Sequence, residues 1–211
     1  MNFNLLCVYI GYFFMVLNVV LYTVSFFQVK KANGFFMTYL YFAFIMNAIM
    51  YVYYILHRSN LVFMNLFFIG DMVLLGLFYS SILKTKWQKM GVKLSIVTAL
   101  LFLIIQIVLN VKQLFTFNLF VIALTCTSLV IFAVMHLYNM LTDKKDYYYF
   151  TIGLILYLSS STILYLVGGL TVKLPDNVKL ISWNLNAVLM IVYQLFILYE
   201  WNVGFFVRKS K

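Results

Sequence analysis

Seven long apolar stretches, separated by short polar connectors, occupy almost the whole chain of 211 residues. A helix that crosses a bilayer core needs about 20 mostly apolar residues, and every stretch reaches that length. The pattern therefore predicts an all-α polytopic membrane protein, in which seven transmembrane helices form one domain over residues 1–211. The predicted spans lie near residues 5–27, 35–56, 61–83, 91–111, 117–141, 147–172 and 179–203.

Composition agrees with this class and excludes a soluble globular protein. The chain is 65% hydrophobic and 9% charged, whereas soluble domains carry about 25% charged residues. The first apolar stretch has no positive charge before it and no small-residue cleavage site after it, so we expect a retained helix rather than a signal peptide. Cys7 and Cys126 fall within spans and lack CxxC spacing, which predicts buried thiols rather than a disulfide or a zinc site.

Lysine and arginine are unequally distributed between the two ends of the predicted spans. Because these residues collect in cytoplasmic loops, their distribution predicts orientation. One side holds four of them: Arg58, Lys112, Lys173 and Lys179. The other side holds eleven: Lys30, Lys31, Lys84, Lys86, Lys89, Lys93, Lys144, Lys145, Arg208, Lys209 and Lys211. This asymmetry predicts the N-terminus outside and the C-terminus inside.

The same asymmetry accounts for the net charge of +10. The connectors are too short to dock nucleic acid, so we expect contact with anionic membrane lipids instead. Lysine outnumbers arginine thirteen to two, which is typical of a low-GC bacterial genome. The sequence therefore favours a multi-pass protein of a bacterial cytoplasmic (inner) membrane.

Two pairs of short segments resemble each other across the chain. Residues 47–52 are similar to residues 161–166, and residues 65–67 are similar to residues 184–186. In a seven-helix protein this spacing suggests a 3+1+3 parallel repeat, in which the fourth helix links two copies of the first three.

Polar residues inside the spans indicate which helix faces point into the bundle, since buried polar groups need partners there. With the predicted orientation, several of them fall in the outer half or at mid-depth. They predict a polar-lined cavity whose ligand contacts are Asp71, Asn65, Asn47, Gln106, Ser160 and Asn186. The alternative is that these side chains only hold helices together, each contact contributing roughly 0.6–2 kcal/mol.

Asp71 is the most informative of these residues. A carboxylate at mid-depth costs roughly 3 kcal/mol even on the most lenient insertion scale. Lys93 and Lys179 lie at the ends of their predicted spans, and no lysine or arginine lies deep enough in a span to pair with it. Asp71 therefore either serves a ligand or a proton, or is a structural hydrogen-bond hub. Glu200 lies near the inner interface, where we expect snorkelling or a salt bridge with Arg208 or Lys209.

Several specific functions can be tested against the chain. A retinal protein needs a lysine in the middle of its last span, and this sequence has none there. A zinc hydrolase needs more His and acidic ligands than the sequence offers. The only proline, Pro175, lies in a connector, which disfavours the hinged helices of a small-solute transporter. Residues 70–74 resemble the Gly-Asp segment of lysoplasmalogenase-type lipid hydrolases, which would use Asp71 in catalysis. The second intramembrane aspartate of that family is missing.

A longer resemblance involves residues 65–79, 117–120, 157–169 and 194–201. These segments, above all the Ser-Ser-Ser-Thr run and the terminal Glu200-Trp201, resemble an uncharacterised family of small seven-helix membrane proteins of Bacteroidota. Members are often encoded beside two-component histidine kinases. The resemblance implies a seven-helix membrane fold and, by association only, a role in signalling.

These observations together predict a sensory or accessory membrane subunit rather than an enzyme. It would bind a lipid or small apolar ligand, with no cofactor and no metal, and would couple to a protein partner in the membrane or cytoplasm. The partner-facing residues would be those of the basic inner connector: Lys84, Lys86, Lys89 and Lys93.

Overall fold

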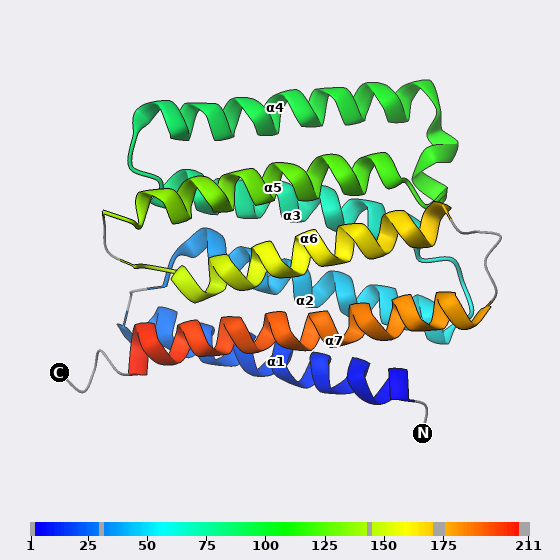
Figure 1. Ribbon diagram of the computed structural model, residues 1–211, viewed down its shortest axis with the longest axis horizontal. Helices are drawn as coiled ribbons and strands as arrows, with labels where there is room; N and C mark the ends of the chain where they lie inside the picture. The colour runs from blue at the N-terminus through cyan, green and yellow to red at the C-terminus, as the bar shows by residue number, and fades with distance from the viewer. Residues whose placement is uncertain (1–2, 30–31, 143–144, 171–175, 207–211) are drawn as a thin grey trace. The chain divides into compact units, whose positions relative to one another are not determined.

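The computed structural model describes residues 3–29, 32–142, 145–170 and 176–206 (Figure 1). Every regular element among them is helical: α1 (Phe3–Val29), α2 (Gly34–Ile55), α3 (Leu61–Ile82), α4 (Lys86–Leu109), the 3-10 helix η1 (Val111–Phe115), α5 (Leu119–Asn139), α6 (Tyr148–Leu170), α7 (Asp176–Trp201) and the π-helical turn η2 (Asn202–Phe206). Within these residues, seven helices are long and apolar enough to cross a membrane. The predicted all-α multi-pass architecture is confirmed.

Two boundaries differ from the sequence prediction. Helix α4 begins at Lys86 rather than near residue 91, because the Thr85 side chain caps it by accepting from the Gln88 amide at 3.3 Å. Hydropathy misses this first turn because lysine and glutamine are polar but good helix formers. The connector expected at residues 112–116 is largely the 3-10 helix η1.

The helices pack as two compact units. Unit 1 comprises Met1–Ala32 and Met140–Lys211, and unit 2 comprises Asn33–Asn139. Helices α1, α6 and α7 therefore belong to unit 1, and α2 to α5 with η1 belong to unit 2. The predicted repeat and the predicted orientation of the termini stay predictions.

In unit 1, α1 and α7 run parallel and are joined by polar contacts at successive turns (Figure 1). The contacts are Asn18 to the carbonyl and side chain of Gln194 (both 2.9 Å), Tyr22 to the Ile197 carbonyl (3.3 Å) and Trp201 to Ser25 (2.7 Å). Each satisfies polar groups that would otherwise be desolvated without a partner. Polar residues of the first and last spans therefore act mainly in helix pairing.

Helix α6 runs antiparallel to α7 in the same unit. The rings of Tyr157 and Tyr193 stack with centroids 4.9 Å apart. One turn earlier, Gly153 lies so close to α7 that an added Cβ would be 2.5 Å from the Cβ of Phe196. The absence of a side chain at Gly153 therefore sets how closely these two helices approach.

In unit 2, α3 packs against α2, α4 and α5 and forms the centre of the unit. Phe78 contacts Phe36 of α2 with ring centroids 5.3 Å apart. An added Cβ on Gly76 would meet Ile96 of α4 and Phe132 of α5. Helices α4 and α5 are also joined by two hydrogen bonds between the amide side chains of Gln88 and Asn139.

Candidate functional site

Asp71 lies in the middle of α3 and is only 7% exposed. Its neighbour Gly70 faces the Phe42 ring of α2, and helix geometry turns the Asp71 side chain about 100° from that direction. The Oδ1 atom is buried and has no hydrogen-bond partner among the described residues. An unpaired buried polar atom costs about 1–3 kcal/mol. The fold thus retains a carboxyl group at mid-span without using this oxygen for helix packing.

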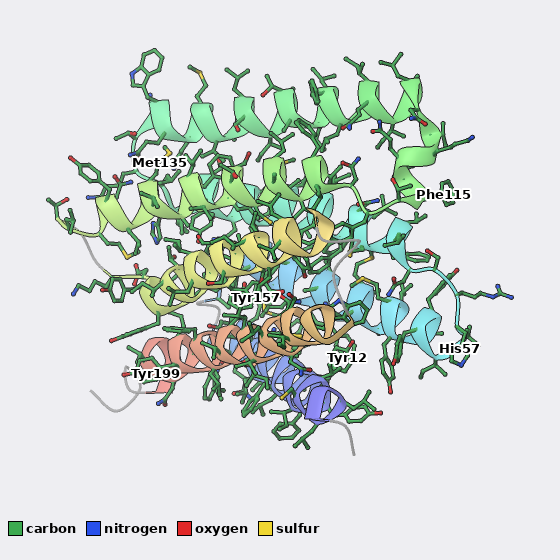
Figure 2. The ribbon with its side chains drawn as sticks, turned by 45° about the vertical axis from the view of Figure 1, so that its right-hand side comes forward. Tyr12, His57, Phe115, Met135, Tyr157 and Tyr199 are labelled. Atoms are coloured by element: carbon green, nitrogen blue, oxygen red, sulfur yellow. The ribbon has the colours of Figure 1, made fainter. Side chains whose placement is uncertain are left out.

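Asn65, two turns before Asp71 on α3, has a different environment and is 1% exposed. Its Nδ2 lies 2.9 Å from the Leu114 carbonyl, 3.0 Å from the Thr116 carbonyl and 3.5 Å from the Gln113 carbonyl. These carbonyls belong to η1 and to the residue after it. This turn joins α4 to α5, and Figure 2 labels Phe115 in it. Asn65 therefore fastens the turn to α3, a structural role that sequence reasoning missed.

Replacing Asn65 with alanine is expected to release this turn from α3. Two or more hydrogen bonds from a buried side chain to main-chain carbonyls are lost, so the free energy of unfolding should fall by about 1–3 kcal/mol. Hydrogen exchange of the amides in residues 111–118 should speed up, while exchange in the middle of α3 changes little. Asn47→Ala is the matched control, because among the described residues the Asn47 Nδ2 bonds only the Ala43 carbonyl of its own helix, at 2.8 Å. Equal exchange of this turn in both variants would contradict the assignment.

The other predicted contacts in unit 2 are Asn47 on α2 and Gln106 on α4. Asn47 is half-buried. Gln106 lies in the last turn of α4, and its Oε1 is buried without a partner among the described residues. Asn65 and Gln106 thus both lie at the η1 end of the unit. Asp71 is six residues after Asn65 on α3, which places it about 9 Å further along the helix axis at a rise of 1.5 Å per residue.

Ser160 and Asn186 belong to unit 1. The Asn186 side chain accepts from Ser161 at 2.9 Å and donates to the Tyr165 hydroxyl at 3.1 Å, so it joins α7 to α6. Ser160 is half-buried and is the neighbour of Ser161 on α6. Asn186 is therefore a helix-pairing residue in the structure, and the six predicted contacts divide into four in unit 2 and two in unit 1.

Glu200 has an environment that differs from the predicted snorkelling one. Its carboxylate is 6% exposed and accepts hydrogen bonds from three main-chain amides at the start of α6: Tyr147 (2.9 Å), Tyr149 (2.8 Å) and Phe150 (3.3 Å). The first amides of a helix have no partner within it, and the helix dipole favours an anion there. Glu200 is therefore a cap supplied by a distant helix rather than a snorkelling side chain; Arg208 and Lys209 lie outside the described residues.

A local signal for this cap exists in the sequence. Helix α6 begins within a run of tyrosines, which lacks the Ser, Thr, Asp or Asn usually found at an N-cap. Tyr147 also has a φ of 59°, a left-handed conformation that is costly for a residue with a Cβ. The buried Glu200 carboxylate from α7 accepts the hydrogen bonds of the amides at this start of α6.

The basic segment predicted to face a partner lies wholly within the described residues. Lys84, Lys86 and Lys93 are exposed, and Lys89 is half-buried. All but Lys84 lie in the first turns of α4, so the predicted connector is mostly helical. Trp87, in the same first turn, is 79% exposed. Aromatic and basic residues together at a helix end are typical of a membrane interface.

The described residues contain no group of three or more His, Cys, Asp or Glu side chains that could hold a metal ion. Cys7 and Cys126 are buried free thiols. The chain matches no protein-family model, no curated protein and no solved structure. The resemblance to the seven-helix proteins of Bacteroidota stays a prediction.

Proposed function

We propose that this protein is a non-enzymatic sensory or accessory subunit of a bacterial cytoplasmic membrane that recognises a lipid or small, mostly apolar ligand at Asp71. The observation that carries the proposal is the unpaired, buried Oδ1 of Asp71 in the middle of α3. The side chains of Asn18, Asn65 and Asn186 each bond a neighbouring element through at least one atom, whereas no hydrogen bond joins the Asp71 Oδ1 to any described residue. Ionisable groups retained at mid-membrane commonly mark functional sites.

The chemistry of Asp71 limits the ligand. An ionised carboxylate only accepts hydrogen bonds, and a protonated one donates a single bond. A ligand with a hydroxyl or amine on an apolar body would satisfy either state within an apolar span. Lipids and small amphipathic molecules have this composition.

The basic start of α4 supports a protein or lipid partner on the side predicted to be cytoplasmic. Within unit 2, the end where α3 meets α4 carries Lys84, Lys86, Lys89 and Lys93, whereas the opposite end carries Arg58 and Lys112. This asymmetry within one unit agrees with the orientation in which the N-terminus lies outside. The ligand signal would pass from Asp71 along α3 to this basic segment and to its partner.

A lipid hydrolase is the less favoured function. It would need a second acidic group beside Asp71, and Glu200 is the only glutamate of the chain. Both carboxylate oxygens of Glu200 accept main-chain hydrogen bonds at the start of α6. A residue used in this way is a poor general acid or base.

Replacing Asp71 with leucine or asparagine tests the proposal. If the carboxyl group serves a ligand, Asp71→Leu should leave the free energy of unfolding unchanged or raise it by about 1 kcal/mol, because an unpaired buried polar group is removed. Both variants should lose the small molecule that copurifies with the wild-type protein, as measured by native mass spectrometry. Ser161→Ala is the control, since it removes a helix-pairing hydroxyl and should lower stability without affecting that molecule.

Two outcomes would contradict the ligand role. A loss of more than about 2 kcal/mol in Asp71→Leu would make Asp71 a structural hub. Retention of the copurified molecule at wild-type occupancy in both Asp71 variants would show that the carboxyl group does not contact it.

A further inference from the structure

The η1 end of unit 2 holds a second group of unpaired buried atoms, separate from Asp71. Asn65 Oδ1, Gln106 Oε1 and Gln113 Oε1 are each buried and have no hydrogen-bond partner among the described residues. All three are amide oxygens, so all three are acceptors. Buried polar atoms of native proteins are nearly always paired, and three unpaired atoms of one kind call for a common explanation.

The fold brings these three side chains to the same end of unit 2. The main chain of Gln113 lies beside the Asn65 side chain, whose Nδ2 is 3.5 Å from the Gln113 carbonyl. Gln106 is joined to η1 through the main chain, because the Asn110 amide donates to the Gln106 carbonyl at 3.1 Å and the Gln113 amide donates to the Asn110 carbonyl at 3.0 Å. The three acceptors therefore belong to one short structure formed by the start of α3, the last turn of α4 and η1.

The direction of Gln106 follows from the buried face of α4. Val92, Ile96, Ala99 and Leu103 are the buried residues of that helix, and Gln106 continues their spacing of three and four residues. The Cβ position of Gly76 on α3 lies 2.6 Å from the Cδ1 of Ile96 on this face. Helices α3 and α4 run antiparallel, so moving forward along α4 corresponds to moving back along α3. Gln106 is ten residues after Ile96, and Asn65 is eleven residues before Gly76. Gln106 and Asn65 therefore lie at about the same level.

Charge and donor capacity identify what such a site would bind. The Asn65 amide nitrogen is already used by the carbonyls of Leu114 and Thr116, so it offers no donor. No carboxylate lies in α4 or η1, and the one in α3 is Asp71, about 9 Å away along the helix axis. Divalent Ca²⁺ and Mg²⁺ are normally held by carboxylates, whereas rings of neutral carbonyl oxygens replace the hydration shell of a monovalent cation.

We propose that Asn65, Gln106 and Gln113 form a binding site for a compact monovalent cation at the end of unit 2 predicted to lie outside. In such a site, neutral oxygens hold a small positive charge. Either an alkali ion or the primary ammonium of a lipid headgroup supplies that charge. Lys112 is the only basic residue of η1 and is exposed. Its charge weakens the site by repulsion, which would keep the affinity modest.

The experiment uses the full chain in detergent and measures the midpoint of thermal unfolding in NaCl, KCl or choline chloride at constant ionic strength. Choline has no N–H group and is much larger than Na⁺ or K⁺. A cation that binds only the folded state raises the midpoint in proportion to ln(1 + [L]/Kd). We expect a higher midpoint in Na⁺ or K⁺ than in choline, and slower hydrogen exchange of residues 111–118. Nanodiscs of phosphatidylethanolamine or phosphatidylcholine in choline buffer test the lipid ammonium in the same way.

Variants link any effect to the site. Gln106→Leu and Gln113→Leu should each weaken the cation dependence at least tenfold, and two variants are used in case one of them folds poorly. Lys112→Gln keeps all three oxygens and should strengthen the dependence several-fold. Stabilisation by alkali ions alone or by phosphatidylethanolamine alone would support the site and identify the source of the cation. An unchanged midpoint in every salt and lipid, or equal dependence in both leucine variants and the wild type, would overturn it.

Discussion

Replacing Glu200 with glutamine or leucine is expected to lower the free energy of unfolding by about 2–4 kcal/mol, the largest effect of any single polar change in unit 1. The carboxylate accepts from the amides of Tyr147, Tyr149 and Phe150, and hydrogen bonds to a charged group contribute about 1.5–3 kcal/mol each before non-additivity. Leucine leaves all three donors unpaired. Glutamine keeps one acceptor but turns an NH₂ group toward a main-chain donor, so its cost should be smaller.

Hydrogen exchange at the start of α6 measures this effect directly. Exchange of the Tyr149 and Phe150 amides should accelerate strongly in both variants, while amides in the middle of α6 keep their protection. Asp146→Asn is the charge-matched control, because it removes an exposed carboxylate beside the same turn. An exposed charge contributes at most about 1 kcal/mol. Similar exchange in Asp146→Asn and Glu200→Gln would show that net charge, and not the cap, protects this turn.

Replacing Gly153 with alanine is expected to cost about 2–3 kcal/mol, at the upper part of the range for overpacking. The new Cβ would be 2.5 Å from the Cβ of Phe196, an atom fixed to the main chain of α7. Rotation of the Phe196 ring cannot relieve that contact, so α6 and α7 would have to separate. The stacked rings of Tyr157 and Tyr193 would then lose contact as well.

Two other glycines provide matched controls for the same substitution. An added Cβ on Gly76 meets the flexible end of Ile96 at 2.6 Å, which can rotate away at lower cost, and nothing lies within 4 Å of the Cβ position of Gly91. We expect Gly76→Ala to cost less than Gly153→Ala, and Gly91→Ala to stabilise α4 by about 0.5–1 kcal/mol. Thermal unfolding of the three variants in one detergent checks the order. A neutral Gly153→Ala would mean that the α6–α7 distance is not set by this residue.

The helical fold could be predicted from the sequence because every span carries enough apolar residues to cross a bilayer. The ends of the helices could not be predicted with the same accuracy. The start of α4 depends on the Thr85 cap and on Lys86 and Lys89, whose polarity hides their tendency to form a helix. The division into two packing units depends on contacts between residues far apart in the chain, such as Asn18 with Gln194.

The candidate site was predictable only where a residue is unusual by itself. Asp71 stands out in any sequence reading because a carboxyl group at mid-span is costly. Asn65 and Glu200 act through main-chain groups about fifty residues away, with sequence separations of 48 to 53. Depth and residue type contain no information on such partners. The sequence therefore predicts a ligand contact at Asn65 but not the bonds by which it holds η1, and it predicts an interfacial Glu200 but not its bonds to the start of α6.

The most direct test of the central proposal, a non-enzymatic subunit with a ligand at Asp71, is mild-detergent purification from the native membrane followed by native mass spectrometry. The proposal predicts a protein partner in fixed stoichiometry and a bound small molecule that is absent from Asp71→Leu. Recovery of the wild-type chain alone, carrying a lipid fragment produced by its own turnover, would contradict it and would favour a hydrolase.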